Sequence, residues 1–393
     1  MGANQLLAEI EAIGRTPGGG YTRTAWDRPT MELREWFAGQ AAALGLELVE
    51  DGNGNQIAWW GSGDDALLIG SHLDSVYEGG PLDGPLGVSS ALAVVAELKA
   101  AGWQPLRPIA VANFTDEEGA RFGVACIGSR LVSGAISPEA ALGLRDDQGN
   151  TLAEVMKAQG RDPRAVGPAP WLSRIGAFVE LHVEQGRWLA PAEAPVGVAT
   201  AIWPHGRYRL DFCGQGNHAG ATAMADRHDP MLTYAATVLA ARELAVAGGQ
   251  RATLGRVQVD PGSTNSIPSR VTAWLDARAA DEGALDALVS GLVARAEAAA
   301  ADEGVTVRVK AESTTPAVNF DADLRHRIAE LIDAPVLPTG AGHDAGILAA
   351  KLPTAMLFVR NPTGVSHAPD EISTPDDIDA GVAALKKVVM ELA

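Results

Sequence analysis

Apolar positions along the chain form short continuous runs that are separated by segments with the pattern of a helix. Four of the apolar runs end in turn residues and predict buried strands; they span 66–73, 107–115, 176–183 and 354–360. Residues 88–102, after the first run, are mostly apolar and end at a glycine, which predicts a helix. Strands separated by helices indicate a mostly parallel sheet that is covered on both faces. We therefore predict an α/β fold for this part of the chain.

The stretch from about 207 to 313 has a different pattern. A strand is followed by a long helix over 229–249, two strands around a turn-rich segment, a second helix over 284–304 and a last strand. This β-α-β-β-α-β order is that of a ferredoxin-like α+β unit. A length of 393 residues also favours two domains. We predict a small domain at 207–314 that is inserted into a larger domain made of 1–206 and 315–393.

Charge and composition exclude several classes of partner. The chain has 31 Lys and Arg residues against 49 Asp and Glu residues, a net charge of −18. Nucleic acids and anionic membranes select surfaces rich in Lys and Arg, so neither is an expected partner. No apolar run approaches the 18 residues of a membrane span. The N-terminus has no signal-peptide pattern and the two cysteines have no CxxC spacing, so we expect a cytoplasmic protein without a disulfide framework.

Acidic and histidine side chains follow the predicted strands. In open parallel sheets, ligands bind beyond the carboxyl ends of the strands. The residues found there are His72, Asp74, Asp83, Asp116, Glu117, Glu118, His182, Glu184 and His367. Each one alone could be a hydrogen-bonded core histidine or a solvated acid, but their shared position favours a common site. Imidazole and carboxylate without thiolate are the ligands that a Zn²⁺ or Mn²⁺ pair would use.

Three further residues have two interpretations each. Asp74 lies two residues beyond His72 and therefore projects to the same side, so it either orients that imidazole or caps a turn. His218 lies on a Gly/Ala loop of the small domain and is either a turn residue or a functional one. His343 begins a helix and either points into the site or caps the helix. No GxSxG elbow and no complete phosphate loop occurs, which sets aside serine hydrolases and P-loop proteins.

Seven motifs resemble one family across nearly the whole chain, from about residue 5 to the end. They occur in this order: GSHLDS…GGPLDGPLG, NFTDEEGARFGVACIGSR, ELHVEQG, GNHAGATAM, TNSIPSRV…LDAR, GAGHDA and GVSHAP. The chain thus resembles the M20-type amidohydrolases of the N-carbamoyl-L-amino acid amidohydrolase, β-ureidopropionase and allantoate amidohydrolase group. The resemblance implies a metallohydrolase catalytic domain with a lid domain that also forms a homodimer.

The resemblance also implies a role for individual residues. Two divalent ions per chain, Zn, Mn, Co or Ni, would be held by His72 and His182 on one side, by Glu118 and His367 on the other, and by Asp83 between them. Glu117 would be the general base, and His218 would stabilise the oxyanion, reaching the site of the neighbouring subunit. The residues expected near the substrate are Gln185, His218, Asn265, Arg278 and His343.

The expected reaction is hydrolysis of a terminal ureido or amide C–N bond on a small carboxylate. The leading hypothesis is conversion of an N-carbamoyl-L-amino acid to the amino acid, CO₂ and NH₃. Allantoate amidohydrolase or a related ureido-acid hydrolase is the alternative, followed by an M20 dipeptidase and a metal-binding protein without turnover. Ala221 and Ala223 stand where the family commonly has Thr and Pro, which leaves the identity of the substrate open.

Overall fold

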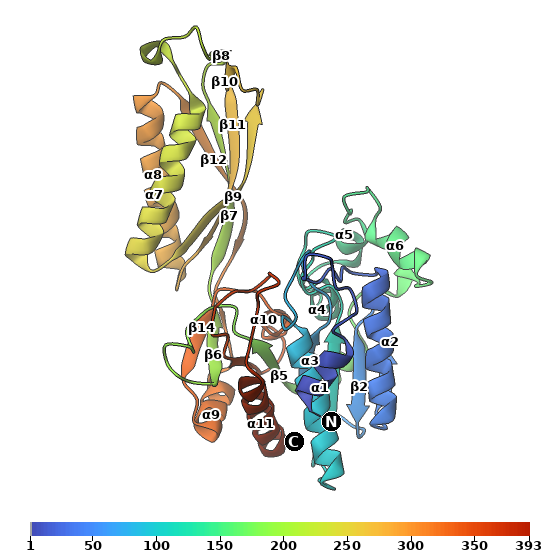
Figure 1. Cartoon of the computed structure of the whole chain (residues 1–393). Helices are drawn as coiled ribbons and strands as arrows, with labels where there is room; N and C mark the ends of the chain where they lie inside the picture. The colour runs from blue at the N-terminus through green and yellow to red at the C-terminus, as the bar shows by residue number, and fades with distance from the viewer. Residues whose placement is uncertain (1) are drawn as a thin grey trace. The chain divides into compact units, whose positions relative to one another are not determined.

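The computed structural model describes residues 2–393, which form two compact units (Figure 1). The large unit comprises the residues up to Ala201 together with Asn319–Ala393, and the small unit comprises Ile202–Val318. These transitions lie a few residues outside the boundaries expected from the sequence. No helix within the described residues is both long enough and apolar enough to cross a membrane.

The large unit is built on a mixed sheet with a parallel centre, as the sequence predicts. Its central strands are β4 (Ile109–Phe114), β3 (Ala66–His72), β5 (Ile175–Val183) and β15 (Thr354–Val359), all parallel to one another. They correspond to the four apolar runs. The sequence pattern did not predict the flanking strands, which are β1 (Glu47–Glu50), β2 (Gln56–Trp60), β6 (Val196–Ile202), β13 (Val318–Asn319) and β14 (Val336–Thr339).

Helices bury the alternate apolar residues of this sheet. One core cluster joins Leu67 and Ile69 of β3 to apolar residues of α1 (Ala3–Glu9), α2 (Arg28–Ala43), α3 (Pro85–Ala100), α9 (Ala322–Ile332) and α11 (Pro375–Leu392). Gly87 allows α3 to approach the sheet, because a Cβ there would lie 2.3 Å from the carbonyl oxygen of Leu181 in β5. A second cluster includes α4 (Ile127–Ser133), α5 (Pro138–Leu142) and α6 (Leu152–Ala158). The remaining helices of this unit are α10 (Asp344–Leu348) and the short 3₁₀ segments Pro163–Ala165 and Pro170–Arg174.

The small unit is a four-stranded antiparallel sheet with two helices. The strand order is β12 (Thr306–Thr315), β7 (His205–Cys213), β11 (Arg270–Arg278) and β9 (Arg251–Asp260). Leu210 and Phe212 of β7 are buried under α7 (Pro230–Gly248) and α8 (Glu282–Asp302), which cover one face. The elements follow one another as β7, α7, β9, β11, α8 and β12. A separate two-stranded ribbon, β8 (Asn217–His218) with β10 (Ser266–Ile267), and a 3₁₀ turn at Met224–Asp226 complete the unit.

Candidate metal centre

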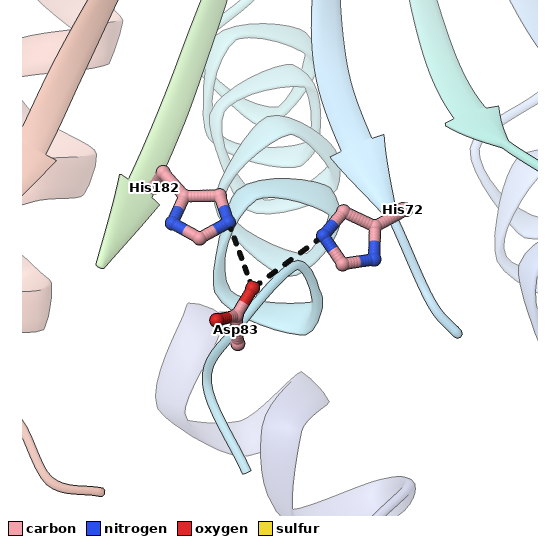
Figure 2. A group of neighbouring side chains, drawn as sticks. All are labelled: His72, Asp83 and His182. Atoms are coloured by element: carbon pink, nitrogen blue, oxygen red, sulfur yellow. Dashed lines mark ion pairs between the residues drawn. The ribbon is translucent and has the colours of Figure 1, made fainter. Parts of the chain in front are cut away.

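Two histidines and one aspartate meet beyond the carboxyl ends of neighbouring strands. His72 is the last residue of β3, His182 lies near the end of β5, and Asp83 lies in the loop before α3. Figure 2 shows both imidazoles directed at the same carboxylate oxygen. His182 Nε2 lies 3.1 Å and His72 Nε2 lies 3.6 Å from Asp83 Oδ1. All three side chains are buried.

The opposite ring nitrogen of each histidine faces a main-chain carbonyl. His72 Nδ1 lies 3.1 Å from the oxygen of Asp74, and His182 Nδ1 lies 2.9 Å from the oxygen of Val183. A proton on Nδ1 that is donated to a carbonyl leaves Nε2 with a free lone pair, which is the arrangement of a metal-ligating histidine. Both rings are therefore oriented to present Nε2 toward Asp83.

Asp74 has a wider role than orienting His72. Its Oδ1 is 3.5 Å from His72 Nδ1, but the nearer partner of that ring is the Asp74 main chain. The carboxylate accepts hydrogen bonds from the amides of Glu117 and Glu118, at 3.1 and 3.0 Å. Asp74 thus ties the loop that carries both glutamates to the end of β3.

A second group of ligand atoms uses the other oxygen of Asp83. His367 Nε2 lies 3.4 Å from Asp83 Oδ2 and 3.4 Å from Glu118 Oε2. His367 is 48% exposed, whereas the two carboxylates are almost fully buried. Asp83 therefore contributes Oδ1 to one group and Oδ2 to the other.

The donor set fits divalent metal ions. His72, Asp83 and His182 form one group whose ligand atoms all lie within 4.8 Å of one another, and Asp83, Glu118 and His367 form another. Within the described residues, the buried atoms His72 Nε2, His182 Nε2 and Glu118 Oε1 have no hydrogen-bond partner. Buried polar atoms are normally satisfied, so a cation that accepts these lone pairs would remove the deficit.

Glu117 lies next to this centre and is buried. Its Oε2 is 3.8 Å from His72 Nε2, and its Oε1 accepts a 3.4 Å hydrogen bond from the Cys126 thiol. Burial raises the pKa of Glu117 well above its usual value, with added repulsion from Asp344 and Glu118, and His72 opposes the rise. A raised pKa makes a carboxylate a stronger base, which favours the removal of a proton from water.

The backbone around the candidate site contains strained residues. Asp116, Cys126 and His367 have φ values of 56°, 59° and 55°, a region that side-chain-bearing residues seldom adopt. Such conformations cost about 1–3 kcal/mol each and cluster at functional sites. The amide of Cys126 donates to the Glu117 carbonyl at 2.6 Å, so the loop of Glu117 and the start of α4 hold each other in place.

Two predicted substrate residues of the large unit lie at this centre. Gln185 donates from Nε2 to Asp83 Oδ2 at 2.7 Å and lies 3.5 Å from His367 Nε2. His343 is buried, with its ring centroid 4.6 Å from that of His182 in an edge-to-face contact. Its side chain makes no capping hydrogen bond to α10 within the described residues, so the structure favours the site interpretation over the helix cap. Burial, together with the charges of neighbouring histidines, lowers the pKa of His343 well below its usual value.

Sequence reasoning missed two buried acids that support the ligands. Glu180 precedes His182 by two residues on β5, and it accepts hydrogen bonds from Ser71 Oγ at 2.7 Å and the Ala345 amide at 3.0 Å. The two-residue period of a strand could have identified it. Glu371 follows His367 by four residues and contacts the loop of Asp83. Nothing in the loop sequence distinguishes it from a surface acid.

In the small unit, the predicted substrate residues do not lie together, because His218 and Asn265 are at the two-stranded ribbon and Arg278 is in the four-stranded sheet. His218 is in β8, and the Asn265 carbonyl beside it accepts a hydrogen bond from Ala219 at 3.0 Å. Arg278 is at the far end of β11, where its guanidinium donates to both oxygens of Asp276, at 2.7 and 3.1 Å. The strand between Arg270 and Arg278 spans roughly 26 Å at 3.3 Å per residue. One small ligand therefore cannot contact Asn265 and Arg278 of the same chain.

Comparison with known proteins identifies the family. The sequence model of peptidase family M20/M25/M40 matches residues 68–391. The chain is 39% identical to N-carbamoyl-L-amino acid amidohydrolase of Geobacillus stearothermophilus, covering 99% of this chain and 97% of that protein. It is 31% identical to allantoate amidohydrolase of Escherichia coli, with 99% and 97% covered. A crystal structure of a hydantoinase/carbamoylase family amidase from Burkholderia multivorans superposes with a TM-score of 0.89 at 31% identity, covering 100% of this chain and 98% of that one. These similarities confirm the resemblance of the motifs, and the chain belongs to peptidase family M20/M25/M40.

Proposed function

We propose that this protein hydrolyses the terminal ureido C–N bond of an N-carbamoyl-L-amino acid. The observation that carries the proposal is the pair of ligand groups that share Asp83, with the buried Glu117 beside them. The 39% identity to an N-carbamoyl-L-amino acid amidohydrolase supports this choice of substrate. A binding protein without turnover would have no use for a buried base next to the ligands, which argues against the non-catalytic alternative.

Two divalent ions, Zn, Mn, Co or Ni, are part of the proposal. His72 and His182 would hold one ion, Glu118 and His367 would hold the other, and Asp83 would contact both. When bound, such a pair lowers the pKa of water and polarises the scissile carbonyl group. The carbonyl contacts at the Nδ1 atoms of both histidines support this assignment, because they fix the rings before any ion arrives.

Glu117 would transfer the protons of the reaction. Its Oε1 is engaged by the Cys126 thiol, so Oε2 is the atom free to take a proton from the attacking water. Glu117 would then deliver this proton to the leaving nitrogen, the C–N bond would break, and NH₃ would depart. The carbamate that remains loses CO₂ and gives the amino acid. His218 is proposed to donate to the oxyanion of the tetrahedral intermediate.

A homodimer would assemble the rest of the substrate site. Because Asn265 and Arg278 of one chain are too far apart for a small substrate, we propose that they act on it from different subunits. The exposed side of α7 carries Leu232, Leu239 and Val246 at seven-residue intervals, which supports association through the small unit. Arg278 would bind the substrate carboxylate with two parallel hydrogen bonds, a contact that Asp276 preorganises.

Complementation between variants tests the shared site. At a substrate concentration far below the raised KM of Arg278→Ala, the His218→Ala and Arg278→Ala homodimers should each be nearly inactive, since each lacks one of the two residues in both sites. Random exchange of their subunits should restore ~25% of wild-type activity, because half of the dimers then contain one intact site. No recovery in a mixture shown by native mass spectrometry to contain heterodimers would refute the shared site.

Allantoate hydrolysis is the second candidate function. The chain is 31% identical to the allantoate amidohydrolase of Escherichia coli and 30% identical to that of Bacillus subtilis, which favours this function. Ala221 and Ala223 leave the pocket for the leaving group undetermined. Ammonia release should be measured with N-carbamoyl-L-amino acids, their D-enantiomers, allantoate, ureidoglycolate and dipeptides, each with and without added metal. Highest kcat/KM for an N-carbamoyl-L-amino acid is expected. Faster turnover of allantoate would replace the leading proposal, and no turnover of any ureido compound would refute both.

A further inference from the structure

Glu371 joins two of the three segments that supply the second ligand group, namely the loop of Asp83 and the loop of His367. The residue is only 3% exposed. Oε2 accepts hydrogen bonds from the amides of Leu82 and Asp83, at 2.8 and 3.0 Å. Oε1 accepts one from the Ser366 hydroxyl at 2.9 Å. One buried carboxylate thus contacts the loop before α3 and the loop after β15, which lie far apart in the sequence.

Both contacts lie directly beside ligand residues. Glu371 accepts a hydrogen bond from the amide of Asp83, and the carboxylate of Asp83 is shared by both ligand groups. Ser366 precedes His367, and its hydroxyl also lies 3.1 Å from Asp83 Oδ2. The Ser366 hydroxyl has one proton, so it links Glu371 and Asp83 by donating to one of them at a time.

The loop before α3 is shaped around this carboxylate. A Cβ at Gly80 would lie 2.2 Å from Glu371 Oε2 and 2.5 Å from its Cδ. No side-chain atom fits there unless the carboxylate moves, so Gly80 is required for the close approach. A larger residue at position 80 would therefore displace Glu371 without removing its charge.

We infer that Glu371 is a positioning residue that sets the distance between Asp83 and His367. The inference rests on the proposed metal centre. Without this carboxylate, the Leu82 and Asp83 amides lose their acceptor and the two loops lose their common contact, so the three ligand atoms of the second group no longer share a fixed geometry. Groups that orient metal ligands typically contribute 10–100-fold to metal affinity. The ion between Asp83, Glu118 and His367 should be the more affected one, because His72 and His182 come from strands.

Metal binding and folding are measured separately to test this. Glu371→Ala, Glu371→Gln and Gly80→Ala are compared with Asp370→Asn, in which an adjacent exposed acid loses its charge. Each protein is stripped of metal, its secondary structure and thermal midpoint are recorded, and Mn²⁺ or Zn²⁺ is titrated against a competing chelator. Glu371→Ala and Gly80→Ala should bind one of the two ions ~10–100-fold less tightly, with the affinity for the other ion changed less. The metal affinity of Glu371→Gln should lie between the affinities of these two variants and of wild type, and that of Asp370→Asn should equal that of wild type.

Excess metal provides the second readout. If Glu371 acts through ligand geometry, saturating metal should restore most of the lost turnover in Glu371→Gln, with KM for the substrate nearly unchanged. Unchanged affinity for both ions in folded Glu371→Ala, or an equal loss in Asp370→Asn, would overturn the inference. If Glu371→Ala does not fold, Glu371→Gln and Gly80→Ala decide by the same criteria. Wild-type protein that binds no divalent ion would instead refute the proposed metal centre.

Discussion

Because Gly84 has no side chain, it allows both the backbone conformation of the loop before α3 and the position of His72 in the candidate metal centre. It precedes α3 with φ 87° and ψ −57°, a conformation that residues with a side chain rarely adopt. A Cβ at this position would lie 2.4 Å from His72 Cε1 and 2.6 Å from His72 Nε2. Gly84→Ala should therefore strain the backbone and push against the imidazole that faces Asp83.

The two effects have separable sizes. A residue forced into a sparsely populated φ/ψ region costs about 1–3 kcal/mol. One extra methyl group in a well-packed site costs about 1–3 kcal/mol more through shifts of its neighbours. Gly102 is the control, because its φ is 71° and, apart from its neighbours in the chain, no heavy atom of the described residues lies within 4 Å of its Cβ position. Gly102→Ala should show only the backbone part, about 1–2 kcal/mol.

Denaturant unfolding of metal-free protein measures both variants against wild type. The free energy of unfolding should fall by about 2–6 kcal/mol for Gly84→Ala, at least ~1 kcal/mol more than for Gly102→Ala. Metal affinity, determined by chelator competition, should fall in Gly84→Ala and stay unchanged in Gly102→Ala, since only the first displaces His72. Equal destabilisation of the two variants with wild-type metal affinity in both would refute this reasoning.

Three other predictions concern the chemistry of the site. Glu117→Gln should keep both metal equivalents, as measured by elemental analysis, and lose at least ~10²-fold in kcat, and near-normal turnover would place the base elsewhere. Burial and the charge of Asp83 raise the pKa of Glu118 to about 7, and the hydrogen bond to Asp83 raises the pKa of His367 to about 9, so in metal-free protein at neutral pH His367 is protonated and Glu118 is partly protonated. Metal affinity should therefore increase with pH above about 6, with net proton release in calorimetry in two buffers, and pH-independent affinity would contradict this. Arg278→Ala should raise KM strongly for carboxylate substrates, and Arg278→Lys should recover only part of the loss because an ammonium group cannot form the paired contact. If Arg278→Ala still discriminates acid from amide substrates as wild type does, Arg278 is not the carboxylate anchor.

The ligand groups could be predicted from the sequence because strand ends are visible there. His72 and His182 each end an apolar run, and parallel strands bring their carboxyl ends to one edge of the sheet. The positions of these two histidines can therefore be predicted without knowing the conformation of any loop. Asp83 and His367 lie in loops, and their assignment depended on the resemblance to a family, because loop conformation is not encoded by periodicity.

The contacts that position the ligands were less predictable, because the sequence of a loop does not show which of its side chains are buried. Glu371 is an acid in a polar loop, and only the folded loop buries it against the amides of Leu82 and Asp83. The separation of Asn265 from Arg278 was, in contrast, available from the sequence. A nine-residue strand, Arg270–Arg278, is long enough to exclude a common small ligand within one chain. The flanking strands β1, β2, β6, β13 and β14 were missed because their short segments carry weak patterns.

The point at which the small unit is inserted affects the order of folding. The chain leaves the large sheet at the end of β6 and re-enters it at β13, a neighbouring strand. Pairing β6 with β13 in an unfolded chain would close a loop on the order of a hundred residues, with an entropic cost that grows with the logarithm of its length. His205 of β7 is paired with Thr315 of β12, so a small unit that folds first holds both ends of the insertion together. Closure then involves only a few flexible residues and costs about 2–3 kcal/mol less. The insertion should therefore fold early, and by holding β6 and β13 close together it should speed the completion of the larger sheet.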